Sequence, residues 1–270
     1  MIWLDKNRIP PGNWPFLNVT RNGLTEIEGE LERDVDLTEG NEAVTITGCA
    51  RAYRQAVLRR VLDLAQGTVI AWNGRLLISA VACARSLHET IATFHSFLKR
   101  AESYAALKEW EKVGQLVDAY SFSTSSTFPK PAKTEFTPPT IGRIVKDFIT
   151  ATQPGCEVFW DQICDTAHPN GQRMMDFAGV LKDRHYIARP SSESEPTLFV
   201  AIFNSLYSCC WLLNSEVDFE ILLAVIREGD ELPADHPLIV QRKKSDAVVA
   251  EVMKNWHPTP VGPLKQTEES

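Results

Sequence analysis

The sequence predicts a predominantly all-α protein, built as an antiparallel helical bundle. Two long segments, within residues 50–72 and 77–98, place apolar side chains three and four residues apart, which is the period of an amphipathic helix. A strongly apolar segment at 196–215 carries no formal charge and predicts a further helix. The chain of 270 residues is 44% hydrophobic and 23% charged, which is typical of a globular protein and excludes a wholly disordered or fibrous chain.

Residues 1–40 are predicted to form an irregular, acidic N-terminal segment. Pro10-Pro11-Gly12 and Trp14-Pro15 are typical of irregular chain. A run of acidic residues follows, opposed only by Arg33, and it predicts a solvated face. The acidic residues are Glu26, Glu28, Glu30, Glu32, Asp34, Asp36, Glu39 and Glu42. The apolar residues between them fit a helical stripe and also alternate, so helix and strand remain alternatives for this run.

Residues 41–227 are predicted to form the bundle domain, and its centre is a pair of long helices. The first helix has apolar and amphipathic residues at helical spacing: Tyr53, Val57, Arg60, Val61, Leu64, Thr68 and Trp72. Asn73-Gly74 then breaks the pattern. The second helix repeats by three and four: Leu77, Ala80, Ala84, Leu87, Ile91, Phe94 and Leu98. Because the connection is so short, we expect the two helices to run antiparallel.

The middle of the chain is predicted to hold shorter helices and one exposed loop. A third helix is predicted at 105–120, and the serines, threonines and prolines near 121–140 predict an exposed loop that does not contribute to a core. Helical spacing resumes at 141–149 and again at 158–163. Pro169 ends the last of these helices, because the residue before a proline is disfavoured in helical conformation.

The C-terminal part adds a small hairpin, an apolar helix and a tail. Residues 180–188 predict a β-hairpin around Lys182-Asp183-Arg184. The apolar segment 196–215 is long enough to raise a membrane-spanning alternative. Its polar members favour a buried core helix instead: Asn204, Ser205, Ser208 and Asn214. Residues 228–270 are predicted to be a C-terminal extension that ends in a disordered tail.

Charge and cysteine usage predict a cytoplasmic protein without general affinity for nucleic acid. The net charge is -7, and no block of Lys and Arg occurs. The first residues lack the basic and apolar regions of a secretory signal, so we expect a cytoplasmic location. No CxxC pair occurs among the six cysteines, which are therefore predicted to be buried thiols. They are Cys49, Cys83, Cys156, Cys164, Cys209 and Cys210.

The tract Cys164-Asp165-Thr166-Ala167-His168-Pro169-Asn170-Gly171 places a histidine, a thiol and a carboxylate at a helix end. There the helix dipole favours a protonated His168. Arg85 and Glu89, four residues apart, share one face of the second long helix. If that face meets the end of the His168 helix, the three residues would form a polar cluster. Such a cluster can draw in phosphate and move a proton, as phosphodiester chemistry requires.

Non-catalytic interpretations stand beside this hypothesis. Arg85 and Glu89 would form an ion pair that pins two helices while His168 caps final carbonyls, and we favour this interpretation because helical bundles commonly contain such a polar lock. Cys164 and His168, with His88 or His95, would ligate zinc, but a convincing second pair of close ligands is missing. We therefore predict no metal. No glycine-rich phosphate loop occurs, and we predict no other cofactor.

Two segments together carry a family resemblance. Ala84-Arg85-Ser86-Leu87-His88-Glu89-Thr90, followed by the tract that contains His168, is similar to uncharacterised bacterial proteins related to the HEPN superfamily. The similarity covers residues 50 to 215. It implies an all-helical bundle that dimerises, so that the motif lines a shared cleft. In HEPN ribonucleases the histidine serves as acid or base at the RNA 2′-hydroxyl, and an arginine a few residues upstream holds phosphate.

The resemblance assigns the histidine role to His168. The three positions at which the arginine would stand are Asp161, Gln162 and Ile163, so Arg173 or Arg85 would have to supply the cation. The candidate catalytic residues are therefore His168, Arg85, Glu89, Asn170 and Arg173. Fold resemblance alone does not transfer chemistry.

The leading functional hypothesis is a HEPN-like module that acts through binding or self-association in a bacterial defence or stress system. The alternative is a divergent, metal-independent RNase that uses His168. We expect a homodimer, an RNA or protein partner, and no membrane association.

Overall fold

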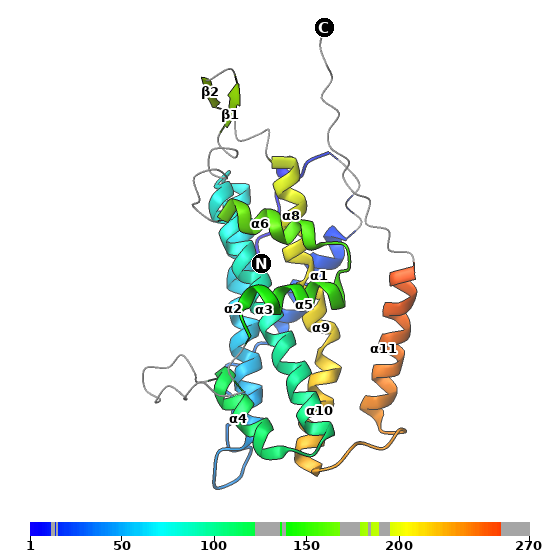
Figure 1. Ribbon diagram of the computed structural model, residues 1–270. Coiled ribbons are helices and arrows are strands. Elements are labelled where there is room, and N and C mark those ends of the chain that lie inside the picture. Colours follow the sequence, from blue (N-terminus) through cyan, green and yellow to red (C-terminus); the bar gives the residue numbers. More distant parts are fainter. Residues whose placement is uncertain are drawn as a thin grey trace.

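The computed structural model is predominantly helical, which confirms the all-α class (Figure 1). It describes residues 1–11, 14, 16–121, 136, 139–167, 179–182, 185–188 and 195–254. Within these residues, one hydrophobic core extends from the N-terminal segment to the helix before residue 229.

The predicted antiparallel pair is confirmed and forms the centre of the bundle. Helix α2 spans Ile46–Asn73, helix α3 spans Leu77–Ala106, and the two pack along each other. Thr45 caps α2, since its hydroxyl oxygen accepts from the Gly48 backbone N–H at 2.9 Å. The tight turn places Arg75, rather than a glycine, in the left-handed region at φ 62°. The apolar stripe predicted for α3 is buried throughout: Leu77, Ala80, Ala84, Leu87, Ile91, Phe94 and Leu98.

Helices α5 (Ile141–Thr152) and α6 (Glu157–Ala167) cover α3, and both lie where helical spacing predicted them. Ile144, Phe148 and Ile163 are buried, as the spacing indicates. The first turns differ from the prediction, because Ile141 is 39% exposed and Val158 is 61% exposed. Ile141 is therefore available at the surface, beside α3.

Helix α4 (Trp110–Ser121) begins later than predicted. The sequence placed a helix at 105–120, but α3 continues to Ala106 and the chain then turns at Lys108, which has φ 57°. The end of α3 is closed by backbone hydrogen bonds to Tyr104 and Ala105. Helical spacing continues across this turn, so periodicity alone did not reveal it.

The predicted exposed loop is wrong at Phe136, which is 7% exposed and packs on Tyr104 at a centroid distance of 6.0 Å. The carbonyl oxygen of Phe136 also accepts from Arg100 at 3.4 Å. Residues 122–135 and 137–138 lie outside the described part. An aromatic ring in a polar segment buries itself when a core surface lies within reach, and the apolar area gained outweighs the loss of freedom.

The apolar segment 196–215 was predicted to be one helix, but it forms two, α8 (Glu195–Tyr207) and α9 (Cys209–Asn214), which are divided at Ser208. Helix α10 (Glu216–Glu228) follows it. Helix α8 packs on α3 and α6. By length and composition alone, Glu195–Glu228 is able to cross a membrane, and 61% of its most apolar window is buried inside the protein. Core helices of soluble proteins have the same properties. That the protein does not associate with a membrane therefore remains a prediction.

The N-terminal segment is not irregular throughout, because α1 spans Leu17–Gly29. Leu24 and Ile27 are fully buried, and α1 packs on α9 and α2. Helix and strand were the alternatives for the acidic run from Leu24 to Leu37; helix is correct up to Gly29, and residues 30–45 form neither helix nor strand. Burial of Leu24 and Ile27 on the same side decides for helix, with the glutamates turned outward.

The remaining described elements lie toward the C-terminus. Strands β1 (Gly179–Lys182) and β2 (His185–Ala188) pair antiparallel, with Val180 opposite Ile187, at the residues for which the sequence predicted a hairpin. Helix α11 (Pro237–Lys254) packs against α10 (Figure 1). Residues 255–270, predicted to be a disordered tail, lie outside the described part.

Candidate functional site

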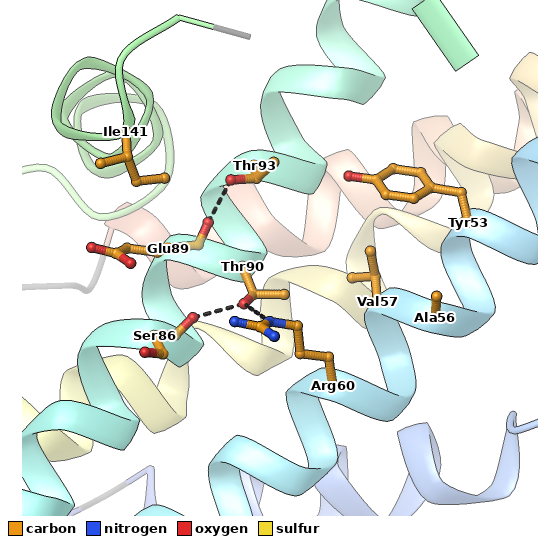
Figure 2. A pocket seen from close by; sticks show the side chains of 9 residues that line it. All are labelled: Tyr53, Ala56, Val57, Arg60, Ser86, Glu89, Thr90, Thr93 and Ile141. Atoms are coloured by element: carbon orange, nitrogen blue, oxygen red, sulfur yellow. Dashed lines mark hydrogen bonds between the residues drawn. The ribbon is translucent and has the colours of Figure 1, made fainter. Parts of the chain in front are cut away.

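A groove lies between α2 and α3, and the first residue of α5 borders it (Figure 2). Its volume is about 330 Å³, which is at the lower end of the range for small-molecule sites. The residues that line it are Tyr53, Ala56, Val57, Arg60, Ser86, Glu89, Thr90, Thr93 and Ile141. Side chains of α2 and α3 face each other across this groove.

Hydroxyl groups of α3 form the polar wall of the groove. Thr90 donates to the carbonyl oxygen of Ser86 at 2.7 Å, and Thr93 donates to that of Glu89 at 2.7 Å. Arg60 crosses from α2, and its Nε donates to Thr90 Oγ1 at 3.1 Å, as Figure 2 shows. This hydrogen bond holds the guanidinium group of Arg60 beside α3, and its two terminal nitrogens face the groove.

Arg85 and Glu89 form an ion pair within α3, with Arg85 Nε 2.9 Å from Glu89 Oε1. Their side chains are 23% and 24% exposed, so the pair is neither sealed in the core nor fully solvated. The pKa of the Cys164 thiol in α6 is raised to about 11, mainly by burial. The charge of Arg85 opposes this rise, and the charge of Glu89 adds to it. The end of α6 therefore lies within electrostatic reach of the pair.

Three of the candidate catalytic residues, His168, Asn170 and Arg173, lie outside the described residues. The last residue of α6, Ala167, directly precedes His168 in the sequence. The structure thus brings Arg85 and Glu89 together and places the end of α6 near them. The cluster with His168 stays a prediction.

His88 and His95 are core residues of α3. His88 is 1% exposed, and its ring lies against Phe148 and Trp160 at centroid distances of 5.4 and 5.6 Å. Burial lowers the pKa of His88 to about 4, and neither of its ring nitrogens has a hydrogen-bond partner among the described residues. His95 is 8% exposed and contacts Phe148 and Trp211, and burial followed by the charge of Lys99 lowers its pKa to about 4.

The zinc alternative combined Cys164 and His168 with His88 or His95, and His168 lies outside the described residues. No group of three or more His, Cys, Asp or Glu side chains able to hold a metal ion occurs within the described ranges. His88 and His95 are instead enclosed by aromatic rings.

The cysteines in the described part are free thiols. Burial raises the pKa of Cys156, Cys164 and Cys210 to about 11, and that of Cys209 well above its usual value. Since the thiolate is the nucleophilic form, these side chains are held in their unreactive, protonated form at neutral pH.

A second, smaller hollow of about 150 Å³ lies where the acidic run meets α2 and α10. Arg54 pairs with Glu30 and lies 3.8 Å from Glu216, and Arg51 lies 3.2 Å from Glu32. Burial and then the charge of Glu30 raise the pKa of Glu216. The carboxylates outnumber the two arginines here, and the ion pairs of Arg51 and Arg54 join the acidic run to α2.

Sequence reasoning did not identify the groove. It placed Tyr53, Val57 and Arg60 on the same stripe as the core residues of α2, and it assigned Ile141 to a core-facing stripe. Two features of the sequence could have indicated it: a charged residue within an apolar stripe at Arg60, and hydroxyl residues at helical spacing on the partner helix.

A scan against protein-family models found no match to this chain, and searches of curated proteins and of solved structures found none either.

Proposed function

We propose that this protein is a HEPN-like helical module that acts through binding or self-association, in a bacterial defence or stress setting. The observation that carries the proposal is the groove between α2 and α3, which presents apolar surface, hydroxyl groups and a guanidinium together. Concave sites that combine apolar walls with a few placed polar groups are the usual form of a binding site.

The chemistry of the described residues favours binding over catalysis. A general acid or base works best with a pKa near the working pH. Burial instead holds His88 and His95 neutral, with pKa values of about 4, and keeps Cys164 protonated, with a pKa of about 11. These groups are thus poor proton carriers at neutral pH, whereas the groove offers hydrogen-bond donors and apolar contact.

The test is to fill the groove without disturbing the core. Ala56 lines the groove and is exposed on α2, so Ala56→Trp places a bulky ring in the groove. Ala247→Trp on α11 is the matched control, because Ala247 is also an exposed helical alanine but does not line the groove. We measure self-association by sedimentation equilibrium and retained protein or RNA by pull-down from the native cell.

The proposal expects the native chain and Ala247→Trp to associate with themselves or a partner, and Ala56→Trp to lose that association at an unchanged melting temperature. A native chain that is monomeric and retains nothing would refute a binding role. Equal association of Ala56→Trp and Ala247→Trp would show that the groove is not the surface involved.

A second candidate function is the metal-independent RNase that uses His168 as acid or base. The observation that favours it is the position of the end of α6 beside the Arg85–Glu89 pair, because that pair acts on Cys164, four residues before His168. Purified protein is incubated with RNA in EDTA and compared with His168→Ala and with His185→Ala, whose side chain is exposed. This candidate requires cleavage by the native chain and by His185→Ala, and its loss in His168→Ala. It is abandoned if native protein does not cleave RNA.

A further inference from the structure

We propose that the groove between α2 and α3 binds a small organic monocarboxylate, with the carboxylate on Arg60 and an apolar body on the walls. This inference rests on the proposed binding function, because it uses the same groove, and it adds a small-molecule ligand to the association proposed above.

The groove has free hydrogen-bond donors. Arg60 uses its Nε on Thr90, and within the described ranges its terminal amines meet no carboxylate. The hydroxyl groups of Ser86 and Tyr53 likewise donate to no other side chain or carbonyl in that part of the chain. Figure 2 shows the Tyr53 hydroxyl and the Arg60 guanidinium both directed from α2 toward α3. Because a guanidinium donates hydrogen bonds and cannot accept them, a ligand of Arg60 must be an acceptor.

The charge of the groove selects a monoanion. Glu89 is neutralised by Arg85 at 2.9 Å, and Figure 2 shows its carboxylate directed to the Ile141 side, away from the guanidinium of Arg60. Arg60 is thus the uncompensated charge among the lining residues. A guanidinium binds a carboxylate through two parallel hydrogen bonds, which balances one charge with one. A phosphate monoester, with a charge of about -1.5 to -2 at neutral pH, would leave excess negative charge in an acidic protein.

The rest of the lining requires an apolar body. Val57 and Ala56 line the α2 side, the Tyr53 ring stands at one end, and Ile141 is 39% exposed at the border. The volume of about 330 Å³ equals that of roughly eleven water molecules at about 30 Å³ each, so it holds roughly a dozen non-hydrogen atoms. A single aromatic ring or a branched chain that carries one carboxylate has this size.

The probe for the test is 3-phenylpropionate, followed by amide chemical shifts of the native chain. A ligand of this size binds with a Kd on the order of millimolar at about -0.3 kcal/mol per non-hydrogen atom. We expect shifts at groove residues of α2 and α3. The neutral analogue 3-phenylpropionamide tests the charge, and phenyl phosphate tests the choice of carboxylate over phosphate. Both are expected to bind more weakly.

Variants locate the site. Arg60→Gln is expected to weaken binding by about tenfold to a hundredfold, which corresponds to the loss of a charged hydrogen-bonded pair. Arg59→Gln is the matched control, because Arg59 is the neighbouring exposed arginine on α2 but does not line the groove. Arg59→Gln is expected to bind as the native chain does. Both substitutions are at exposed positions, and thermal melting checks that both variants fold.

Three results would overturn the ligand class: no shift at groove residues with 3-phenylpropionate, equal binding of the amide, or an equal effect of Arg59→Gln and Arg60→Gln. If phenyl phosphate binds more strongly than 3-phenylpropionate, the ligand class is a phosphate, and the carboxylate proposal is overturned. None of these results affects the loss of association expected for Ala56→Trp. The failure of the ligand class and the failure of the binding function are therefore separate outcomes.

Discussion

The buried imidazole of His88 is expected to make this protein lose stability in mild acid. The ring is 1% exposed, lies between Phe148 and Trp160, and has no hydrogen-bond partner among the described residues for either nitrogen. Protonation would place a charge in this apolar site, which explains why burial lowers the pKa of His88 from 6.5 to about 4. In the unfolded chain the same imidazole is solvated and titrates near its ordinary pKa.

The sign and size of the effect follow from these two pKa values. Because the folded pKa is lower, protons bind more readily to the unfolded chain, and stability is lost as the pH falls. The loss starts near pH 6.5 and is complete near pH 4. A difference of about 2.5 pKa units corresponds to about 3 kcal/mol for complete protonation, at about 1.4 kcal/mol per unit. Between pH 7.5 and pH 5 the titration of His88 lowers the free energy of unfolding by about 2 kcal/mol.

The assay compares the native chain with His88→Met in urea unfolding, followed by circular dichroism between pH 7.5 and pH 5. Methionine is apolar, flexible and of similar size, so it fills the site without a titratable group. His95 titrates in the same range in both proteins and cancels in the comparison. We expect the native chain to lose about 2 kcal/mol more than His88→Met over this interval. His185→Asn is the control, because it removes an imidazole from an exposed position. Parallel pH profiles for the native chain and His88→Met would refute this account of His88.

Three further substitutions test the packing and the ion pairing of the bundle. A Cβ atom at Gly48 would stand 2.3 Å from the backbone oxygen of Leu37, so Gly48→Ala is expected to lower the free energy of unfolding by about 2 kcal/mol, whereas Gly29→Ala, with nothing within 4 Å, should raise it by about 0.5 kcal/mol. Equal urea midpoints for these two variants would contradict the close approach at Gly48. Glu195 accepts two hydrogen bonds from Arg8, at 3.0 and 2.9 Å, with side chains only 15% and 10% exposed, so Glu195→Ala should cost about 3 kcal/mol, measured by urea unfolding at neutral pH. A loss below about 1 kcal/mol would show that solvent already screens this pair.

Local properties of the sequence determined the helical class and the central pair. Apolar side chains at intervals of three and four residues define the buried face of α2 and α3 wherever those helices pack. The break at Asn73-Gly74 determined the antiparallel connection, because so short a turn leaves the second helix no other direction. The predicted burial of α5 and α6 was correct at Phe148 and Ile163 for the same reason.

Tertiary packing decided which side chains the protein presents. Periodicity shows that a helix has an inner face, but not which neighbour stands opposite each residue of that face. Arg60 occupies the edge of the α2 stripe, and it borders a groove only because the hydroxyls of α3 face it across the seam. Leu24 became a core residue of α1, and Phe136 a core residue beyond α4, because distant elements offered each of them an apolar surface. Because such contacts join residues far apart in the chain, the spacing of neighbouring residues does not predict them.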